Sequence, residues 1–125
     1  MADRRRDLGR VAEDAAAAWL AGLGLEIVAR NVRFSLGEID LVCRDRDAYV
    51  FVEVKARRAA WGDPASAAVT RGKQRRLVQL AHAYLKWKGL RERRCRFDVV
   101  SVTLGTDGSP GGIRHLPAAF TEEAW

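Results

Sequence analysis

Acidic residues interrupt two apolar segments of this chain. The first segment, Gly37–Val42, contains Asp40, and the second, Phe51–Lys55, contains Glu53 and ends on a lysine. A carboxylate in an apolar strand costs free energy unless it is paired with a cation or binds one. Two carboxylates on neighbouring strands, with a lysine beside them, are suited to hold a hard divalent cation and an activated water molecule. That is the chemistry of phosphodiester hydrolysis.

The spacing of these residues favours a common site. Residues i and i+2 of a strand project to one face, so Glu53 and Lys55 should point the same way. The charged segment Arg44–Asp47 predicts a hairpin turn that brings Asp40 alongside Glu53. Glu38 shares a face with Asp40 by strand alternation. Three roles stay open for it: a supporting group of the site, a metal ligand, or a solvent-facing residue at the start of the strand.

The composition limits the classes of protein to which the chain can belong. Its 22 Lys and Arg residues exceed its 16 Asp and Glu residues by six, which favours a polyanionic partner, nucleic acid before membrane. No apolar segment approaches the roughly 20 residues of a membrane helix, and 125 residues fit a single domain, 1–125. Cys43 and Cys95 lack metal-ligand spacing, which indicates reduced thiols in a cytoplasmic protein or a single disulfide.

Hydrophobic periodicity predicts the elements that position the acids. A first helix over about residues 4–23 should bury the stripe Leu8, Ala12, Ala15, Trp19 and Leu23, with Glu13 at its border. The other expected elements are strands at 25–30, 38–43, 49–56 and 96–102, a turn or bulge at 31–37, a second helix at about 73–88 and a short edge strand at 113–116. A strand–helix–strand connection implies parallel pairing. The fold class is therefore α/β, in the order α-β-β-β-α-β, with a mixed sheet flanked by helices.

A wider set of residues carries a family resemblance. The pattern comprises Gly9, Glu13, Arg30-Asn31, Gly37–Leu41, Phe51–Lys55, Lys73-Gln74, Arg96–Val100, His115 and Ala119-Phe120. With these residues the chain resembles the PD-(D/E)XK nuclease superfamily. Within it, the chain looks like the YraN-type family of largely uncharacterised bacterial proteins, which is related to archaeal Holliday-junction resolvases.

The resemblance implies a restriction-endonuclease-like core and a role for each matching residue. Asp40 matches the first metal-binding acid, and Glu53 and Lys55 match the acid and lysine of the second half-motif. Val54 would offer its backbone carbonyl to the metal, and Glu13 matches the acid that the first helix contributes in resolvase-like members. The implied cofactor is Mg²⁺ or Mn²⁺, which takes oxygen ligands.

Simpler interpretations stand beside these. Ile39 precedes Asp40 where the superfamily is named for a proline. Asp40 alone is compatible with a local ion pair, Glu53 with a salt bridge to Lys55 or Arg57, and Glu13 with an ordinary surface position. Asp98 is expected to pair with a nearby arginine, and His82 and His115 to be structural.

The basic residues near these acids are candidates for nucleic-acid contacts. Arg57 and Arg58 follow the active strand, and Lys73 and Gln74 open the second helix, where a solvated helix face is an equal alternative. Trp61, on a loop, is a candidate for stacking on a base.

The sequence thus predicts a metal-dependent endonuclease acting on DNA, with branched or otherwise structured DNA favoured. The alternatives are a catalytically silent nucleic-acid-binding module with the same fold, or an accessory protein whose basic face binds a protein. Symmetric cutting of junctions needs two active sites, and hence a homodimer.

Overall fold

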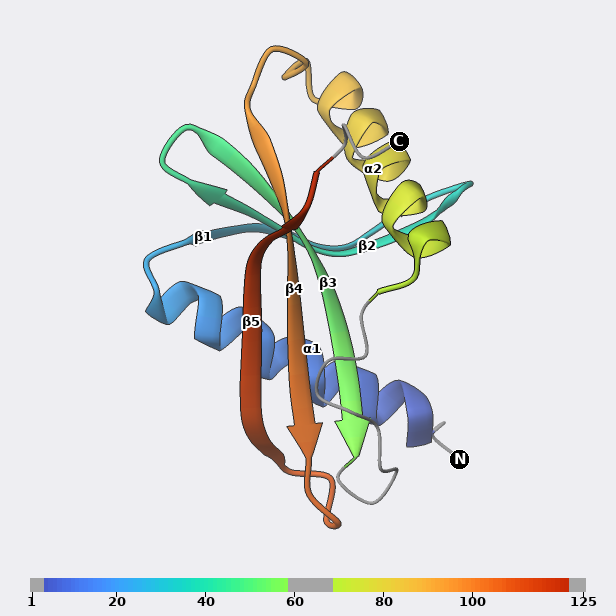
Figure 1. Ribbon diagram of the computed structural model, residues 1–125, viewed down its shortest axis with the longest axis vertical. Helices are drawn as coiled ribbons and strands as arrows, with labels where there is room; N and C mark the ends of the chain where they lie inside the picture. Colours follow the sequence, from blue (N-terminus) through green and yellow to red (C-terminus); the bar gives the residue numbers. More distant parts are fainter. Residues whose placement is uncertain (1–3, 59–68, 122–125) are drawn as a thin grey trace.

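The computed structural model of the protein, which describes residues 4–58 and 69–121, contains one five-stranded sheet and two helices (Figure 1). The elements are α1 (Arg4–Gly22), β1 (Glu26–Phe34), β2 (Gly37–Asp45), β3 (Ala48–Arg58), α2 (Arg71–Trp87), β4 (Cys95–Leu104) and β5 (Pro110–Phe120). The strands lie side by side in chain order, and only β3 and β4 are parallel. The predicted mixed α/β sheet is confirmed, and the edge strand β5 is longer than expected.

The two helices cover opposite faces of this sheet and give it two cores. Figure 1 shows α1 crossing the lower part of the sheet and α2 beside the upper part. On the face of α1, Leu20 packs with Leu41, Val52 and other aliphatic side chains. On the face of α2, Tyr84 packs with Phe51 and other large side chains. Because β3 is central and buried on both faces, its even-numbered residues face α1 and its odd-numbered residues face α2.

The buried stripe of α1 differs from the predicted one. Ala12, Ala16, Ala17 and Leu20 are buried, whereas Trp19 is 42% exposed. Of the predicted stripe, Ala12 is fully buried and Leu8 and Ala15 are partly buried against the core, so the prediction is wrong for Trp19. Leu23, also predicted to be buried, is 54% exposed at the end of the helix.

This correction changes the position of Glu13. At about 100° per residue, Glu13 lies within about 60° of Ala16, Ala17 and Leu20 around the helix axis. It therefore lies within the sheet-facing stripe and not at its border. Its half-buried side chain is directed to the sheet by the same packing that anchors α1.

The first strand is longer than predicted, because β1 continues through Asn31 to Phe34 and only Ser35 and Leu36 form the turn. The predicted turn or bulge survives as a local distortion at Asn31, whose φ is +52°. Asparagine tolerates this left-handed conformation better than most residues. The pairing register places Asn31 opposite Asp40.

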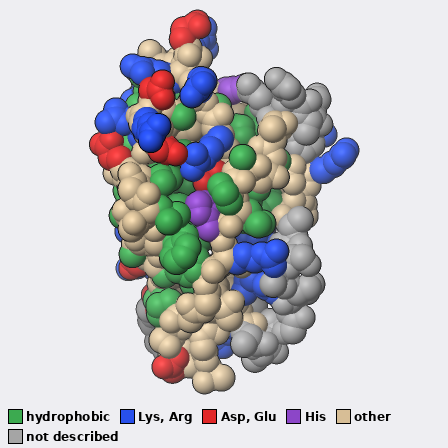
Figure 2. Space-filling view, turned by 60° about the vertical axis from the view of Figure 1, so that its left-hand side comes forward, with side chains coloured by type: hydrophobic (Ala, Val, Ile, Leu, Met, Phe, Trp, Pro, Cys, Tyr) green, Lys and Arg blue, Asp and Glu red, His purple; other side chains and the backbone are tan. Residues whose placement is uncertain are grey.

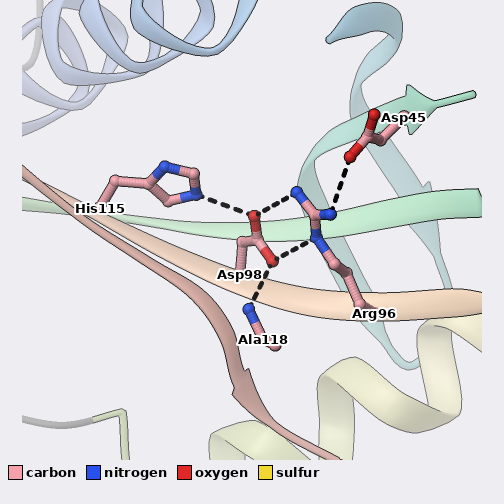
Figure 3. A network of polar contacts seen from close by, with 5 residues as sticks. All are labelled: Asp45, Arg96, Asp98, His115 and Ala118. Carbon is pink, nitrogen blue, oxygen red and sulfur yellow. Dashed lines mark hydrogen bonds and ion pairs between the residues drawn. The ribbon is translucent and has the colours of Figure 1, made fainter. Parts of the chain in front are cut away.

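A buried polar network attaches the edge strand β5 to the sheet (Figure 3). Asp98 is fully buried, and its carboxylate accepts hydrogen bonds from Arg96 Nε (3.1 Å) and from the backbone N–H of Ala118 (2.9 Å). His115 Nε2 lies 2.8 Å from the other carboxylate oxygen, and Arg96 also contacts Asp45 at 2.9 Å. The predicted pairing of Asp98 with an arginine is confirmed, and His115 belongs to the same network.

The start of α2 is fixed by a cap. Thr70 has an extended backbone, and its side-chain oxygen accepts a hydrogen bond from the backbone N–H of Lys73 at 3.2 Å. Gln74 Nε2 donates to the carbonyl oxygen of Val69 at 2.9 Å. Both contacts hold the first turn of α2, and with it Lys73, in a defined place.

We expect Thr70→Ala to lower the free energy of unfolding by about 1 kcal/mol, because the N–H of Lys73 loses its acceptor. Thr70→Ser keeps the oxygen and should remain near the wild-type value. Urea titration followed by circular dichroism measures both. Equal stability of the alanine variant and the wild type would contradict the capping role.

Both cysteines are free thiols, so the alternative of a disulfide between them is wrong. Burial raises the pKa of the Cys43 thiol to about 12, which makes it an inert core residue. Neither of the two helices in the described residues is long and apolar enough to cross a membrane.

Candidate active site

The strand β2 separates from β3 at Asp40. Pairing between the two strands ends at Leu41 and Val52, and the backbone N–H of Val54 donates instead to Oδ2 of Asp40 at 2.8 Å. Ile39 packs on the α2 side of the sheet and Leu41 on the α1 side, although regular alternation would put them on one face. The alternation of side chains along β2 is therefore interrupted at Asp40. The Asp40 carboxylate replaces a backbone carbonyl as the acceptor for the N–H of Val54.

Three further acids surround this carboxylate. Burial raises the pKa of Asp40 to about 7, and the negative charges of Glu53, Glu13 and Glu38 contribute to this rise, against the hydrogen bond from Val54. These side chains come from three different elements: Glu13 from α1, Glu38 and Asp40 from β2, and Glu53 from β3. The fold thus brings three further carboxyl groups within electrostatic reach of Asp40.

Cations from β3 and α2 face the same cluster. Burial raises the pKa of Glu53, while the charges of Lys73 and Lys55 lower it. Lys73 stands in the first turn of α2, which the Thr70 cap holds in place. The site therefore combines acids with lysines close enough to moderate their charge.

Glu13 has its own local partners. Burial raises its pKa first and the charge of Glu38 next, while the charge of Arg30 and a hydrogen bond with the Asn31 side chain lower it. The distorted position in β1 thus also supplies a contact to the helix acid. Glu38 forms an ion pair with Arg33 at 3.0 Å, and its side chain is 31% exposed.

Two hollows open beside the acids, and Glu38 borders both. The larger, of about 440 Å³, is lined by Arg10, Glu13, Asn31, Arg33 and Glu38. The smaller, of about 130 Å³, is lined by Gly37, Glu38, Glu53, Lys73, Arg76, Leu77 and Leu80. Glu13 and Glu53 thus each border a hollow with basic side chains at its edge, which suits an anionic substrate.

The structure brings some of the predicted site residues together and separates others. Glu13, Asp40, Glu53, Lys55 and Lys73 lie within electrostatic reach of the cluster. Gln74 instead holds the backbone at the start of α2.

The predicted contacts after the active strand lie farther away. Arg57 is four residues beyond Glu53 on β3, about 13 Å along the strand, and it is only 8% exposed. Arg58 follows it at the end of β3. Trp61 lies outside the described residues.

Sequence reasoning missed three basic side chains at the hollows. Arg10 comes from α1, Arg33 from the unexpected extension of β1, and Arg76 from α2, where its side chain packs so close to Gly37 that a Cβ there would lie 3.3 Å from it. The sequence signal for Arg33 was hidden because residues 31–37 resemble a turn. Arg76 could have been found from its spacing to Lys73, which places both on neighbouring positions of one helix face.

The donor groups fit a hard divalent cation. Asp40, Glu53 and Glu13 offer carboxylates and Val54 a carbonyl, which are the oxygen ligands that Mg²⁺ and Mn²⁺ prefer. Their mutual repulsion, visible in the raised pKa of Asp40, is what a dication would relieve. Among residues 4–58 and 69–121, however, no three acidic, histidine or cysteine side chains are already grouped as metal ligands.

Comparison with known sequences places the chain among bacterial relatives. Residues 12–102 match the Uncharacterised protein family UPF0102. A UPF0102 protein of Symbiobacterium thermophilum is 52% identical over 104 residues, which cover 82% of this chain and 87% of that protein. A UPF0102 protein of Pelotomaculum thermopropionicum is 44% identical over 120 residues, covering 96% of this chain and all of the relative. A UPF0102 protein of Anaeromyxobacter dehalogenans is 49% identical over 119 residues, which cover 94% of this chain and 87% of that protein.

Proposed function

We propose that this chain, which belongs to the Uncharacterised protein family UPF0102, is a metal-dependent nuclease that hydrolyses phosphodiester bonds in DNA. Branched or otherwise structured DNA is the favoured substrate. The fold we propose is a restriction-endonuclease-like core in a single domain, which the helix-first order and the position of β3 at the centre of the mixed sheet support.

One observation carries this proposal: four acids from three elements gather at Asp40, whose pKa is raised to about 7. Burying like charges together costs stability, so such clusters concentrate at functional sites. The alternative of a simple local ion pair for Asp40 does not account for the other three acids. Glu38, with its partner Arg33, fits that simpler interpretation.

Each residue has a defined task in this proposal. Asp40, Glu53, Glu13 and the Val54 carbonyl would hold Mg²⁺ or Mn²⁺. When bound, the metal would lower the pKa of a coordinated water and offset negative charge on the phosphate. Lys55 projects from the same face of β3 as Glu53, where it can orient the attacking water and stabilise charge on the phosphate oxygens. Lys73 and Arg76 at the smaller hollow would bind the neighbouring phosphate.

A second candidate is a nucleic-acid-binding module that does not cleave. The observation in its favour is that the acids of the described residues are not grouped as a ready metal site. In that case the cluster would be a remnant or a structural device, and the basic side chains at the hollows would remain the functional part.

Metal binding and cleavage separate the two candidates. We expect calorimetry to detect Mg²⁺ or Mn²⁺ binding to the wild type, and Glu53→Gln to abolish both that binding and cleavage of junctions, flaps or duplexes. Salt-dependent DNA binding should survive in Glu53→Gln, because its basic neighbours are unchanged. Lys55→Met should lower the cleavage rate by about 100-fold or more while metal still binds.

The matched control is Glu92→Gln, an exposed glutamate in the turn before β4. It removes the same charge and should leave metal binding and cleavage at wild-type levels. Absence of metal binding in the wild type, with and without DNA, would sink the nuclease proposal and favour the binding module.

A further inference from the structure

The helix α2 has an unusual charge distribution. The segment Arg71–Trp87 contains no Asp or Glu. Its buried side carries Leu77, Leu80, Ala81, Tyr84 and others, which lock the helix onto the sheet. Its exposed side carries Arg71, Lys73, Arg75 and Arg76 in the first two turns and Lys86 in the last turn, with His82 between them.

Several basic residues outside α2 lie close to acids. Figure 2 shows Lys and Arg side chains gathered at the upper end of the molecule, interleaved there with Asp and Glu. Elsewhere, Arg44 pairs with Glu26 and Arg30 with Asp14. The basic residues of α2, by contrast, have no acid on the same helix.

The distal end of α2 is shaped as well as charged. A hollow of about 350 Å³ is lined by His82, Ala83, Leu85, Lys86 and Arg91, with no acid among its described lining residues. The negative end of the helix dipole accounts for one cation in the last turn, Lys86. It does not account for Arg91, which lies beyond the helix and faces the same hollow.

The proximal end of the same helix borders the acids. Lys73 and Arg76 line the smaller hollow together with Glu53. Thirteen residues separate Lys73 from Lys86, about 20 Å of helix. That length matches roughly six base-pair steps of a DNA duplex, each rising about 3.4 Å. A nucleic acid that passes the acids can therefore reach the distal hollow within a single helical turn of the duplex.

We propose that the exposed side of α2 is the docking surface for the nucleic-acid substrate. The hollow formed by His82, Lys86 and Arg91 binds a backbone phosphate of the same nucleic acid, at a distance from the acids. Lys86 and Arg91 supply the charge, and Ala83 and Leu85 line the same hollow. The course of the nucleic acid along this docking surface rests on the proposed function, because the acids are taken as the point of cleavage.

The test is DNA binding by a double variant, Lys86→Gln with Arg91→Gln, in EDTA so that no cleavage occurs. The probe is a fluorescein-labelled duplex of about 20 base pairs, long enough to span two helical turns, followed by anisotropy at several salt concentrations. We expect the affinity at about 100 mM salt to fall roughly 10-fold and the salt slope to decrease by about one, because one phosphate contact is lost.

A second double variant, Arg46→Gln with Arg114→Gln, is the matched control. It removes two positive charges from the β2–β3 turn and from β5, neither of which belongs to α2, and it should change the affinity less than two-fold. If both double variants weaken DNA binding equally, or if neither weakens it, the proposed docking surface is wrong. Binding of inorganic phosphate alone as tight as that of the duplex would also contradict it.

This result can be told apart from failure of the proposed function. If Glu53→Gln abolishes cleavage while the Lys86/Arg91 variant binds DNA normally, the nuclease proposal is supported and the docking surface is wrong. If the wild type never cleaves but the Lys86/Arg91 variant alone loses affinity for DNA, the docking surface is supported and the nuclease proposal is wrong.

Discussion

Asp40→Asn is expected to make the metal-free protein more stable at pH 8 while abolishing cleavage. Asp40 is mostly buried among Glu13, Glu38 and Glu53, and the asparagine removes a charge that this environment opposes. The amide oxygen of the introduced asparagine can still accept the hydrogen bond from Val54, so the backbone contact at the strand separation is kept. Loss of activity with a gain in stability is the expected sign of a functional residue held under strain.

The pH dependence of this gain has a defined sign. The pKa of Asp40 rises from its ordinary 3.8 to about 7 in the folded protein. Between these values the folded state binds the proton more tightly than the unfolded state, so the wild type loses stability as the pH rises through this window. Three pKa units correspond to at most about 4 kcal/mol. The advantage of Asp40→Asn should therefore be small at pH 4, grow up to pH 7 and level off above it.

Urea titrations at pH 4, 6 and 8 in EDTA measure this gain. Asp47→Asn is the control, because it removes the same charge from the exposed turn between β2 and β3 and should show no such growth with pH. A stability difference that stays constant across this range, or a less stable Asp40→Asn variant at pH 8, would refute the crowded-acid interpretation.

The second large effect is expected at Asp98. Its carboxylate satisfies Arg96, His115 and the N–H of Ala118 at once, and its exposure is 0%. Asp98→Ala leaves these donors without their buried acceptor, which costs about 3–5 kcal/mol when a buried pair is broken. We expect a loss of that size in urea unfolding at pH 7.

Asp98→Asn provides the graded comparison. An asparagine keeps one acceptor oxygen and the shape of the side chain, so it should recover part of the stability lost by alanine. Asp107→Ala, in the exposed turn before β5, removes an acid outside the network and should cost less than half as much. An Asp98→Ala variant within about 1 kcal/mol of the wild type would contradict the anchoring role of this network.

The order of elements could be predicted from the sequence because their patterns are strong. The β-branched run of β3 and the 3.6-residue period of α2 each point to one structure. The parallel pairing of β3 with β4 follows from the helix between them. The acids of the site were also identifiable, because Asp40 and Glu53 each interrupt an apolar strand.

The errors came from places where local signals compete with packing. Asn31 and Gly37 resemble turn residues, yet cross-strand pairing with β2 carries β1 through to Phe34. In α1, Trp19 is the largest apolar residue of the predicted stripe, yet Leu20 and three alanines make the contact with the sheet. Side-chain size indicates hydrophobicity, but close approach of a helix to a sheet rewards small residues.

The pairing of the strands and the position of α2 determine which basic residues lie near the acids. Arg57 follows Glu53 closely in sequence but is buried farther along β3. Arg33 and Arg76 are distant in sequence but border the hollows beside Glu38. Sequence distance is a poor measure here, because antiparallel pairing and the crossover helix bring separate segments to one point.

The hydrogen bond from Val54 to Asp40 gives the protein a built-in spectroscopic probe. A backbone amide that donates to a titrating carboxylate changes its electronic environment whenever that carboxylate gains or loses a proton or a cation. The amide resonance of Val54 in a ¹⁵N-labelled sample should therefore move with pH and with added Mg²⁺, and it should do neither in Asp40→Asn. The backbone of β3 thus registers the charge state of the acid cluster without any added label at the site.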